Sequence, residues 1–239
     1  MTNDVPNFPK RVPVEARVAQ LPDDPLAAQL RGFGPLGLLA ILIIVLASVL
    51  KPLSAALVLL WVWRSHTPWR EIGYVRPRSW IATLVVGLVF GCAFKLVMKA
   101  IVMPLLGAPE INSVYHYLIG NRAALPGLVF TMIVSAGFAE ETIFRGFLFE
   151  RLSKLFGTGA SAKVLIVLLT SAVFALGHYA NLGLPGVEQA IFTGLVFGTI
   201  FAITGRIWMV MCAHAAFDLT AVAIIYWNLE AAVAHLVFK

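Results

Sequence analysis

The feature that most constrains the fold of this chain is a succession of long apolar segments separated by short charged loops. The clearest of these segments lie at residues 80–106, 126–149, 164–180, 186–204 and 207–228. A run of about 20 apolar residues can cross the hydrocarbon core of a bilayer as a helix, which satisfies its own backbone hydrogen bonds there. The sequence therefore predicts an all-α fold, a polytopic integral membrane bundle of about six to eight transmembrane helices.

Composition and charge agree with a membrane protein. Of the 239 residues, 60% are hydrophobic and 13% are charged, values outside the usual range of soluble domains. The formal net charge is +6, and the basic residues gather in loops such as 64–79 and 150–163. This is the positive-inside pattern, so we expect these loops on the cytoplasmic side of a bacterial-type inner membrane. The expected partner of the basic residues is the lipid bilayer and not nucleic acid.

The chain is expected to have four parts: a polar tail (1–32), an N-terminal membrane segment with a basic loop (33–79), a membrane core (80–228) and a C-terminal tail (229–239). The polar tail carries five prolines and mixed charges, which predicts a mostly disordered or surface-lying segment. Within residues 33–63, Pro52 follows Lys51 and removes a backbone donor. Either one long kinked helix or two short helices could form there.

Three charged side chains lie close together inside the apolar segment 126–149: Glu140, Glu141 and Arg145. Ionisable groups in a membrane segment are costly and usually functional. Residues four apart share a helix face, so Glu141 is expected to pair with Arg145. Neighbouring residues point about 100° apart, which leaves Glu140 as the free carboxylate. In the simpler alternative, both glutamates form structural ion pairs with arginines.

Two further pairs of residues share a helix face at the same spacing. Phe174 and His178 lie near the end of one apolar segment, and His214 and Asp218 lie early in the last one. Histidine titrates near neutrality and can act as an acid, a base or a metal ligand. A carboxylate four residues after His214 can orient its ring. The simpler alternatives are a packed His178 and a His214–Asp218 hydrogen bond that joins two helix turns.

Two chemistries fit the polar residues of these three helices. In one, Glu140, His178 and His214 hold a divalent metal such as zinc, with an open position for water. In the other, Glu140 and a histidine activate water directly, while the remaining histidine and Asp218 hold a developing oxyanion. The sequence has no HExxH helix, which is the strongest sequence signal for the metal case. Metal dependence therefore stays open at this point.

The order of the three motifs, EExxxR, FxxxH and HxxxD, each on its own apolar segment, resembles the CPBP family of intramembrane proteases. That family includes the type II CAAX prenyl endopeptidases and bacteriocin-immunity relatives, and the resemblance covers about residues 80–228. It implies an endopeptidase in which Glu140 and His178 activate the attacking water and His214 with Asp218 stabilises the oxyanion. Asp218 stands where many members have asparagine, and orienting His214 is its more natural role because an ionised aspartate is a poor donor.

The resemblance also implies that Glu141 and Arg145 shape the site, with Phe174 beside them. The expected function is therefore intramembrane hydrolysis of a peptide or membrane-protein substrate. The sequence leaves the oligomeric state and the lipidation of the substrate open. Two alternatives are a proton- or ion-coupled transporter that uses the same polar groups as a relay, and a non-catalytic immunity or scaffold protein.

The depth of His178 conflicts with a simple arrangement of spans. Glu140 and His214 are expected near the cytoplasmic side, whereas His178 comes out near the opposite side if its helix begins at Val164. For the three side chains to meet, the helix before His178 must start below the membrane surface, or a segment must be re-entrant.

Overall fold

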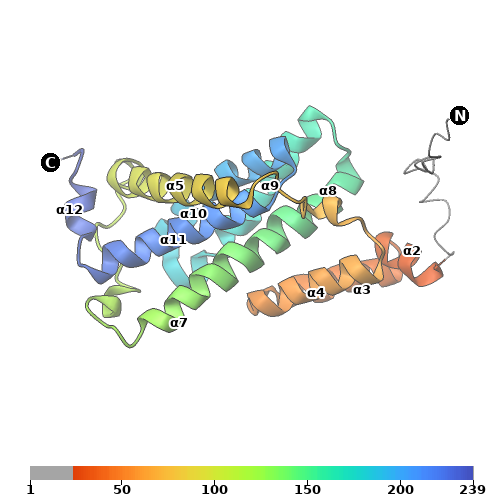
Figure 1. Ribbon diagram of the computed structural model, residues 1–239, viewed down its shortest axis with the longest axis horizontal. Helices are drawn as coiled ribbons and strands as arrows, with labels where there is room; N and C mark the ends of the chain where they lie inside the picture. The colour runs from red at the N-terminus through yellow and green to blue at the C-terminus, as the bar shows by residue number, and fades with distance from the viewer. Residues whose placement is uncertain (1–23, 239) are drawn as a thin grey trace, which may run out of the picture.

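The computed structural model describes residues 24–238, and their regular structure is helical without a strand (Figure 1). The predicted all-α class is confirmed. Residues 1–23 of the predicted polar tail lie outside the described residues. The remaining part of that tail forms helix α2, Pro25–Arg31, and is not disordered. Asp24 begins this helix because its side chain accepts the backbone N–H groups of Leu26 and Ala27.

The α-helices of the described residues follow in chain order: α2 (Pro25–Arg31), α3 (Pro35–Leu46), α4 (Lys51–Arg64), α5 (Trp80–Val97), α6 (Met103–Leu105), α7 (Leu125–Phe130), α8 (Phe149–Phe156), α9 (Ala160–Leu176), α10 (Tyr179–Thr204), α11 (Trp208–Tyr226) and α12 (Glu230–Ala234). Short 3₁₀ turns are η1 (Ala47–Val49), η2 (Trp69–Ile72) and η4 (His116–Leu118). Wider π-helical stretches are η3 (Met98–Val102), η5 (Thr131–Glu140) and η6 (Thr142–Leu148). They continue their neighbouring α-helices, so that Trp80–Leu105 and Leu125–Phe156 are each one long helix.

By length and composition, four helices of the described residues can cross a membrane: Trp80–Leu105, Leu125–Phe156, Tyr179–Thr204 and Trp208–Tyr226. A fifth is added if α2 and Pro35–Val49, bent by 57°, form one span. This number is lower than the predicted six to eight because α4 and α9 are short. At 1.5 Å per residue, they rise about 21 and 26 Å, less than a hydrocarbon core of about 30 Å.

Residues 33–63 form two short helices, which settles the alternative that the sequence left open. Helices α3 and α4 lie side by side as a hairpin, and its tip ends beside the long helix Leu125–Phe156 (Figure 1). Pro52 occupies the first turn of α4, where the missing N–H group breaks no helical hydrogen bond. The hydroxyl of Ser54 donates to the carbonyl of Ile44 at 2.8 Å and ties the two helices together.

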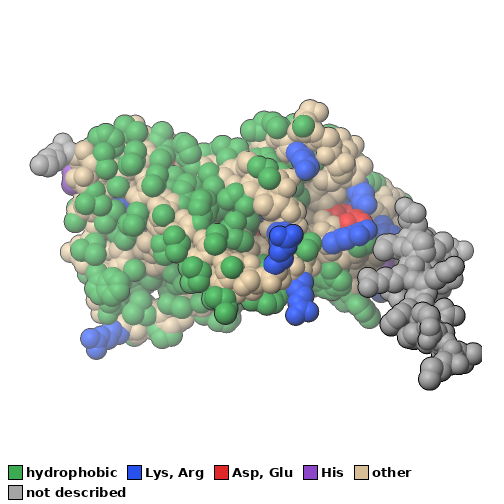
Figure 2. Space-filling model, turned by 45° about the horizontal axis from the view of Figure 1, so that its top comes forward, with side chains coloured by type: hydrophobic (Ala, Val, Ile, Leu, Met, Phe, Trp, Pro, Cys, Tyr) green, Lys and Arg blue, Asp and Glu red, His purple; other side chains and the backbone are tan. Residues whose placement is uncertain are grey.

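The base of this N-terminal hairpin, Pro35–Arg64, is fixed to α2. Arg64 Nη1 lies 2.6 Å from Asp24 Oδ2, and this hydrogen bond is the main reason that the pKa of Asp24 is lowered to about 2. The indole N–H of Trp61 donates to the carbonyl of Leu30 at 3.0 Å. Many Lys and Arg side chains gather toward this end of the molecule, while apolar side chains cover much of the remaining face (Figure 2).

Helices α5 and α11 pack closely along small residues. A Cβ atom added at Gly91 would lie 2.1 Å from the carbonyl oxygen of Ala213, and one at Gly87 would lie 2.6 Å from the Cβ of Cys212. On the other side of α11, a Cβ at Gly137 would lie 2.7 Å from the Cβ of Ala215. Because glycine permits these close approaches, α11 is held between α5 and η5.

We expect Gly91→Ala to lower the free energy of unfolding by about 1–3 kcal/mol, because the added methyl group meets backbone and cannot be accommodated by a rotamer change. The measurement is the thermal unfolding midpoint of the purified protein in detergent. Gly127→Ala is the matched control, since nothing lies within 4 Å of its added Cβ. Equal midpoints for the two variants would contradict the close packing of α5 on α11.

Candidate active site

Glu140, Glu141 and Arg145 lie where the long helix Leu125–Phe156 passes the middle of the bundle, and all three side chains are buried. Arg145 Nη1 donates to Glu141 Oε1 at 2.8 Å, so the ion pair predicted from the spacing forms. The guanidinium of Arg145 also lies 4.8 Å from the ring centroid of Phe174 on α9. This contact brings the FxxxH motif of α9 against the EExxxR motif.

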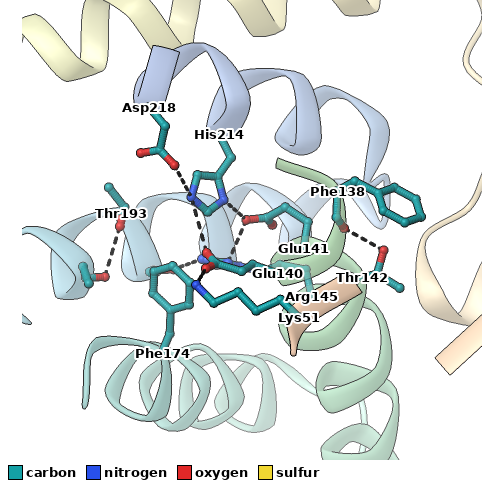
Figure 3. Close-up of polar contacts among 12 residues, drawn as sticks. Lys51, Phe138, Glu140, Glu141, Thr142, Arg145, Phe174, Thr193, His214 and Asp218 are labelled. Atoms are coloured by element: carbon teal, nitrogen blue, oxygen red, sulfur yellow. Dashed lines mark hydrogen bonds and ion pairs between the residues drawn. The ribbon is translucent and has the colours of Figure 1, made fainter. Parts of the chain in front are cut away.

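Both carboxylates face His214 of α11, although the sequence predicted that they would point apart (Figure 3). His214 Nδ1 lies 2.6 Å from Glu141 Oε1, and His214 Nε2 lies 3.6 Å from Glu140 Oε2. The prediction assumed the 100° rotation of an α-helix. In a π-helical stretch with i→i+5 hydrogen bonds, more residues make one turn, so neighbouring side chains diverge less.

His214 is the centre of the cluster. Because a carboxylate can only accept, the short contact assigns the Nδ1 proton to a hydrogen bond with Glu141. Nε2 is then turned toward Glu140 and also lies 3.6 Å from Asp218 Oδ2. The ring is enclosed by Phe197 and Phe174, with centroid distances of 5.3 and 6.0 Å. The two helices therefore present three polar atoms to one small space, as Figure 3 shows.

Glu140 Oε2 is buried and has no hydrogen-bond partner among the described residues. Buried carboxylate oxygens are normally satisfied by protein groups or by ordered water. The oxygen lies opposite His214 Nε2, with Asp218 Oδ2 on the other side of that nitrogen. This arrangement of acceptors and an imidazole can hold a water molecule next to a carboxylate.

His178 does not join this cluster directly. It follows the end of α9, where its Nδ1 lies 2.8 Å from the carbonyl oxygen of Phe174. Its ring is tilted by 56° against that of Phe174, with 4.7 Å between the ring centroids, and Phe174 in turn contacts Arg145 and His214. No ion pair or hydrogen bond links His178 to Glu140 or His214 among the described residues. Helix α9 is short and α10 breaks at Gly183, which has φ 61°, so His178 lies at a helix junction near the site.

Lys51 is a site residue that the sequence interpretation missed. Its ammonium group pairs with Glu140 Oε1 from the start of α4 (Figure 3). Glu140 is thus not a free carboxylate, since one of its oxygens is occupied. From the sequence, Lys51 was assigned no role beyond preceding Pro52. A charged residue within an apolar stretch was the signal that could have identified it.

The loop that follows η2 also contacts the long helix Leu125–Phe156, through Tyr74. The hydroxyl of Tyr74 lies 2.7 Å from Thr142 Oγ1, and Thr142 donates to the carbonyl of Phe138 at 2.8 Å. Burial raises the pKa of Tyr74 to about 12, so this hydroxyl stays protonated across the physiological range. The contact fixes the turn that directly follows Glu141.

The donor set does not fit the metal alternative. Across residues 24–238, no three His, Cys, Asp or Glu side chains are grouped so that they could hold a metal ion. Of the proposed ligands, Glu140 gives one oxygen to Lys51, and His178 stands apart behind Phe174. No chemical step is therefore derived through a metal.

Comparison with known proteins agrees with the three motifs. Residues 122–220 match the model of a family described as type II CAAX prenyl endopeptidase Rce1-like. No curated protein and no solved structure matches the chain. The matched region contains every residue predicted for the site, from Glu140 to Asp218, whereas Lys51 precedes it.

Proposed function

We propose that this integral membrane protein, which is CAAX-protease-like through residues 122–220, is an endopeptidase in which Glu140 activates the attacking water. The observation that carries the proposal is the convergence of Glu140 Oε2 and Asp218 Oδ2 on His214 Nε2, each at 3.6 Å. A carboxylate oxygen with an imidazole nitrogen opposite it is suited to proton transfer from water.

In the proposed reaction, Glu140 Oε2 removes a proton from water while the water oxygen attacks the carbonyl carbon of the scissile peptide bond. The carbonyl oxygen becomes an oxyanion, and protonated His214 donates Nε2–H to it. Glu141 stabilises that protonated ring through Nδ1, and Arg145 balances the charge of Glu141. The proton on Glu140 then passes to the leaving nitrogen as the C–N bond breaks.

Asp218 and His178 take supporting roles in this proposal. Asp218 shares the face of His214 and orients its ring, because an ionised carboxylate cannot donate to an oxyanion. His178 was expected to activate water together with Glu140. With its Nδ1 held by the Phe174 carbonyl, its Nε2 is the atom left for proton transfer once a substrate is bound.

Figure 2 and the basic loops support an orientation in which the end with α2 and η2 faces the cytoplasm of a bacterial-type cell. The matched family description suggests that the substrate is a prenylated peptide. A peptide cut within the membrane or a lipid-free segment of a membrane protein would use the same site. The test therefore compares a substrate that carries a prenyl group with one that does not.

The test uses the full chain in liposomes with two internally quenched peptides that differ by a farnesyl group on the cysteine of a C-terminal Cys-aliphatic-aliphatic-X sequence. We expect cleavage of at least the farnesylated peptide, and none by Glu140→Gln. Cleavage of both peptides at equal rates would show that the protein does not require a prenyl group on its substrate. If neither peptide is cut, and the peptides released from cell membranes are the same for the wild type and Glu140→Gln, the proposed function is wrong.

A further inference from the structure

The N-terminal hairpin, Pro35–Arg64, delivers a charge to the site from outside the family-matched region. Lys51 begins α4 at the hairpin tip, and its ammonium group pairs with Glu140 Oε1. The Lys51 side chain is 41% exposed, whereas that of Glu140 is 2% exposed. The lysine therefore reaches from the outer surface of the bundle to a carboxylate that lies inside it.

The hairpin is a fixed part of the bundle rather than a loosely attached arm. Helix α4 buries three side chains, Val58, Trp61 and Val62, in one cluster with Ile143 and Phe147. The last two follow Glu140 on the long helix Leu125–Phe156. The rings of Trp61 and Phe147 meet edge to face at 5.1 Å. Packing of this kind defines where the first turn of α4 lies relative to Glu140, and so where the lysine can reach.

Resting on the proposed function, we propose that Lys51 is a positioning residue for Glu140. By holding Oε1, the ammonium group leaves Oε2 as the oxygen directed at His214 Nε2. Without it, the carboxylate could rotate or turn its other oxygen toward His214, and the acceptor for the water proton would no longer be defined.

Lys51 also balances the charge of the cluster. Glu140, Glu141 and Asp218 bring three carboxylates to one buried region, and Arg145 is engaged by Glu141. An unpaired carboxylate is costly in an apolar environment. The lysine ammonium therefore stabilises ionised Glu140, the form that can accept a proton.

A contact that simply blocked the site would have the opposite consequence. If Lys51 occupied Glu140 until a substrate displaced it, removing the lysine would increase the rate of cleavage or lower KM. Positioning instead predicts a loss in kcat with little change in KM, because the lysine acts on the carboxylate and not on the bound peptide.

The experiment compares Lys51→Met and Lys51→Arg with the wild type, using the quenched peptide that the wild-type protein cuts. We expect Lys51→Met to lose about 10–100-fold in kcat, with KM within about twofold, and Lys51→Arg to recover most of that loss. Lys99→Met is the matched control. Like Lys51, Lys99 pairs with a buried carboxylate, Glu230 Oε1 at 3.4 Å, but it lies in the helix Trp80–Leu105 away from Glu140, so the variant's kcat should stay near the wild-type value.

Every other result overturns the proposal. Wild-type kcat in Lys51→Met would show that Glu140 needs no partner, and a faster variant would identify Lys51 as a block. A loss that Lys51→Arg does not recover, or that Lys99→Met shares, would attribute the effect to packing or to general stability. Because wild type and Glu140→Gln are assayed alongside, failure of the proposed function is seen separately as a wild type that cuts nothing or a Glu140→Gln that still cuts.

Discussion

Glu140→Gln is expected to lower kcat by on the order of a thousandfold while KM changes by less than about threefold. Glutamine has the shape of glutamate and keeps an oxygen that can accept from Lys51, so the helix and the ion-pair partner need not move. Its amide cannot take the proton of the attacking water. The measurement is initial cleavage rates of the quenched peptide by protein in liposomes, over a range of peptide concentrations.

Two further variants make this prediction specific to the position of the carboxylate. Glu140→Asp keeps the charge but withdraws it by one methylene group from His214 Nε2, and should lose about 10–100-fold in kcat. Glu71→Gln removes a carboxylate of the η2 turn that pairs with Lys154 at 3.0 Å, away from the cluster, and should leave kcat unchanged. Wild-type kcat in Glu140→Gln would exclude this carboxylate as the general base.

The fold class, an all-α membrane bundle, could be predicted because it depends on local patterns. Apolar length identifies a helix that can cross a bilayer, and the charge of the loops between such helices indicates orientation. Hydropathy does not report where a helix stops inside the membrane. The short α9 and the hairpin α3–α4 look like spans in the sequence, but their ends are set by tertiary contacts such as the Ser54–Ile44 hydrogen bond.

Within the candidate site, the contacts could be predicted where both partners lie within one helix turn. The Glu141–Arg145 pair and the approach of His214 to Asp218 follow from a spacing of four residues. The direction in which the Glu140 side chain points could not be derived in this way. It depends on a π-helical stretch that turns both glutamates toward His214, and no pattern in the sequence indicates that stretch. The contact of Lys51 with Glu140 spans 89 positions of the chain and depends on the hairpin.

The structure also shows how a buried cluster with so many charges can be tolerated. Glu141 accepts from both Arg145 and His214, so a single carboxylate oxygen joins two helices. The aromatic rings of Phe174 and Phe197 surround the guanidinium, at 4.8 and 5.9 Å from its central carbon. The cost of burying this arginine is thus offset by an ion pair and by cation–π contacts. The side chains that hold this cluster together are thus the ones to which the proposed mechanism assigns roles.

Arg145→Met is accordingly expected to be the most destabilising single substitution in the cluster, lowering the free energy of unfolding by about 3–5 kcal/mol. Methionine fills part of the same space but leaves Glu141 buried with its charge and with His214 as its remaining partner. The double variant Glu141→Gln/Arg145→Met should recover a substantial part of the loss, because it removes the uncompensated charge. Unfolding of each purified protein in detergent, followed by temperature or denaturant, measures the difference.

Arg122→Met is the control for this comparison, since Arg122 is exposed in the loop before α7 and a surface substitution should change the free energy of unfolding by no more than about 0.5 kcal/mol. If Arg145→Met were as stable as Arg122→Met, the Glu141–Arg145 pair would not support the fold. If the double variant were less stable than Arg145→Met alone, the cost would lie in lost hydrogen bonds of the Glu141 carboxylate to His214 rather than in its unpaired charge. Recovery of stability in the double variant would show that the loss in Arg145→Met comes from the unpaired charge of Glu141. This is the expected result, because Glu141, Arg145 and His214 are all buried.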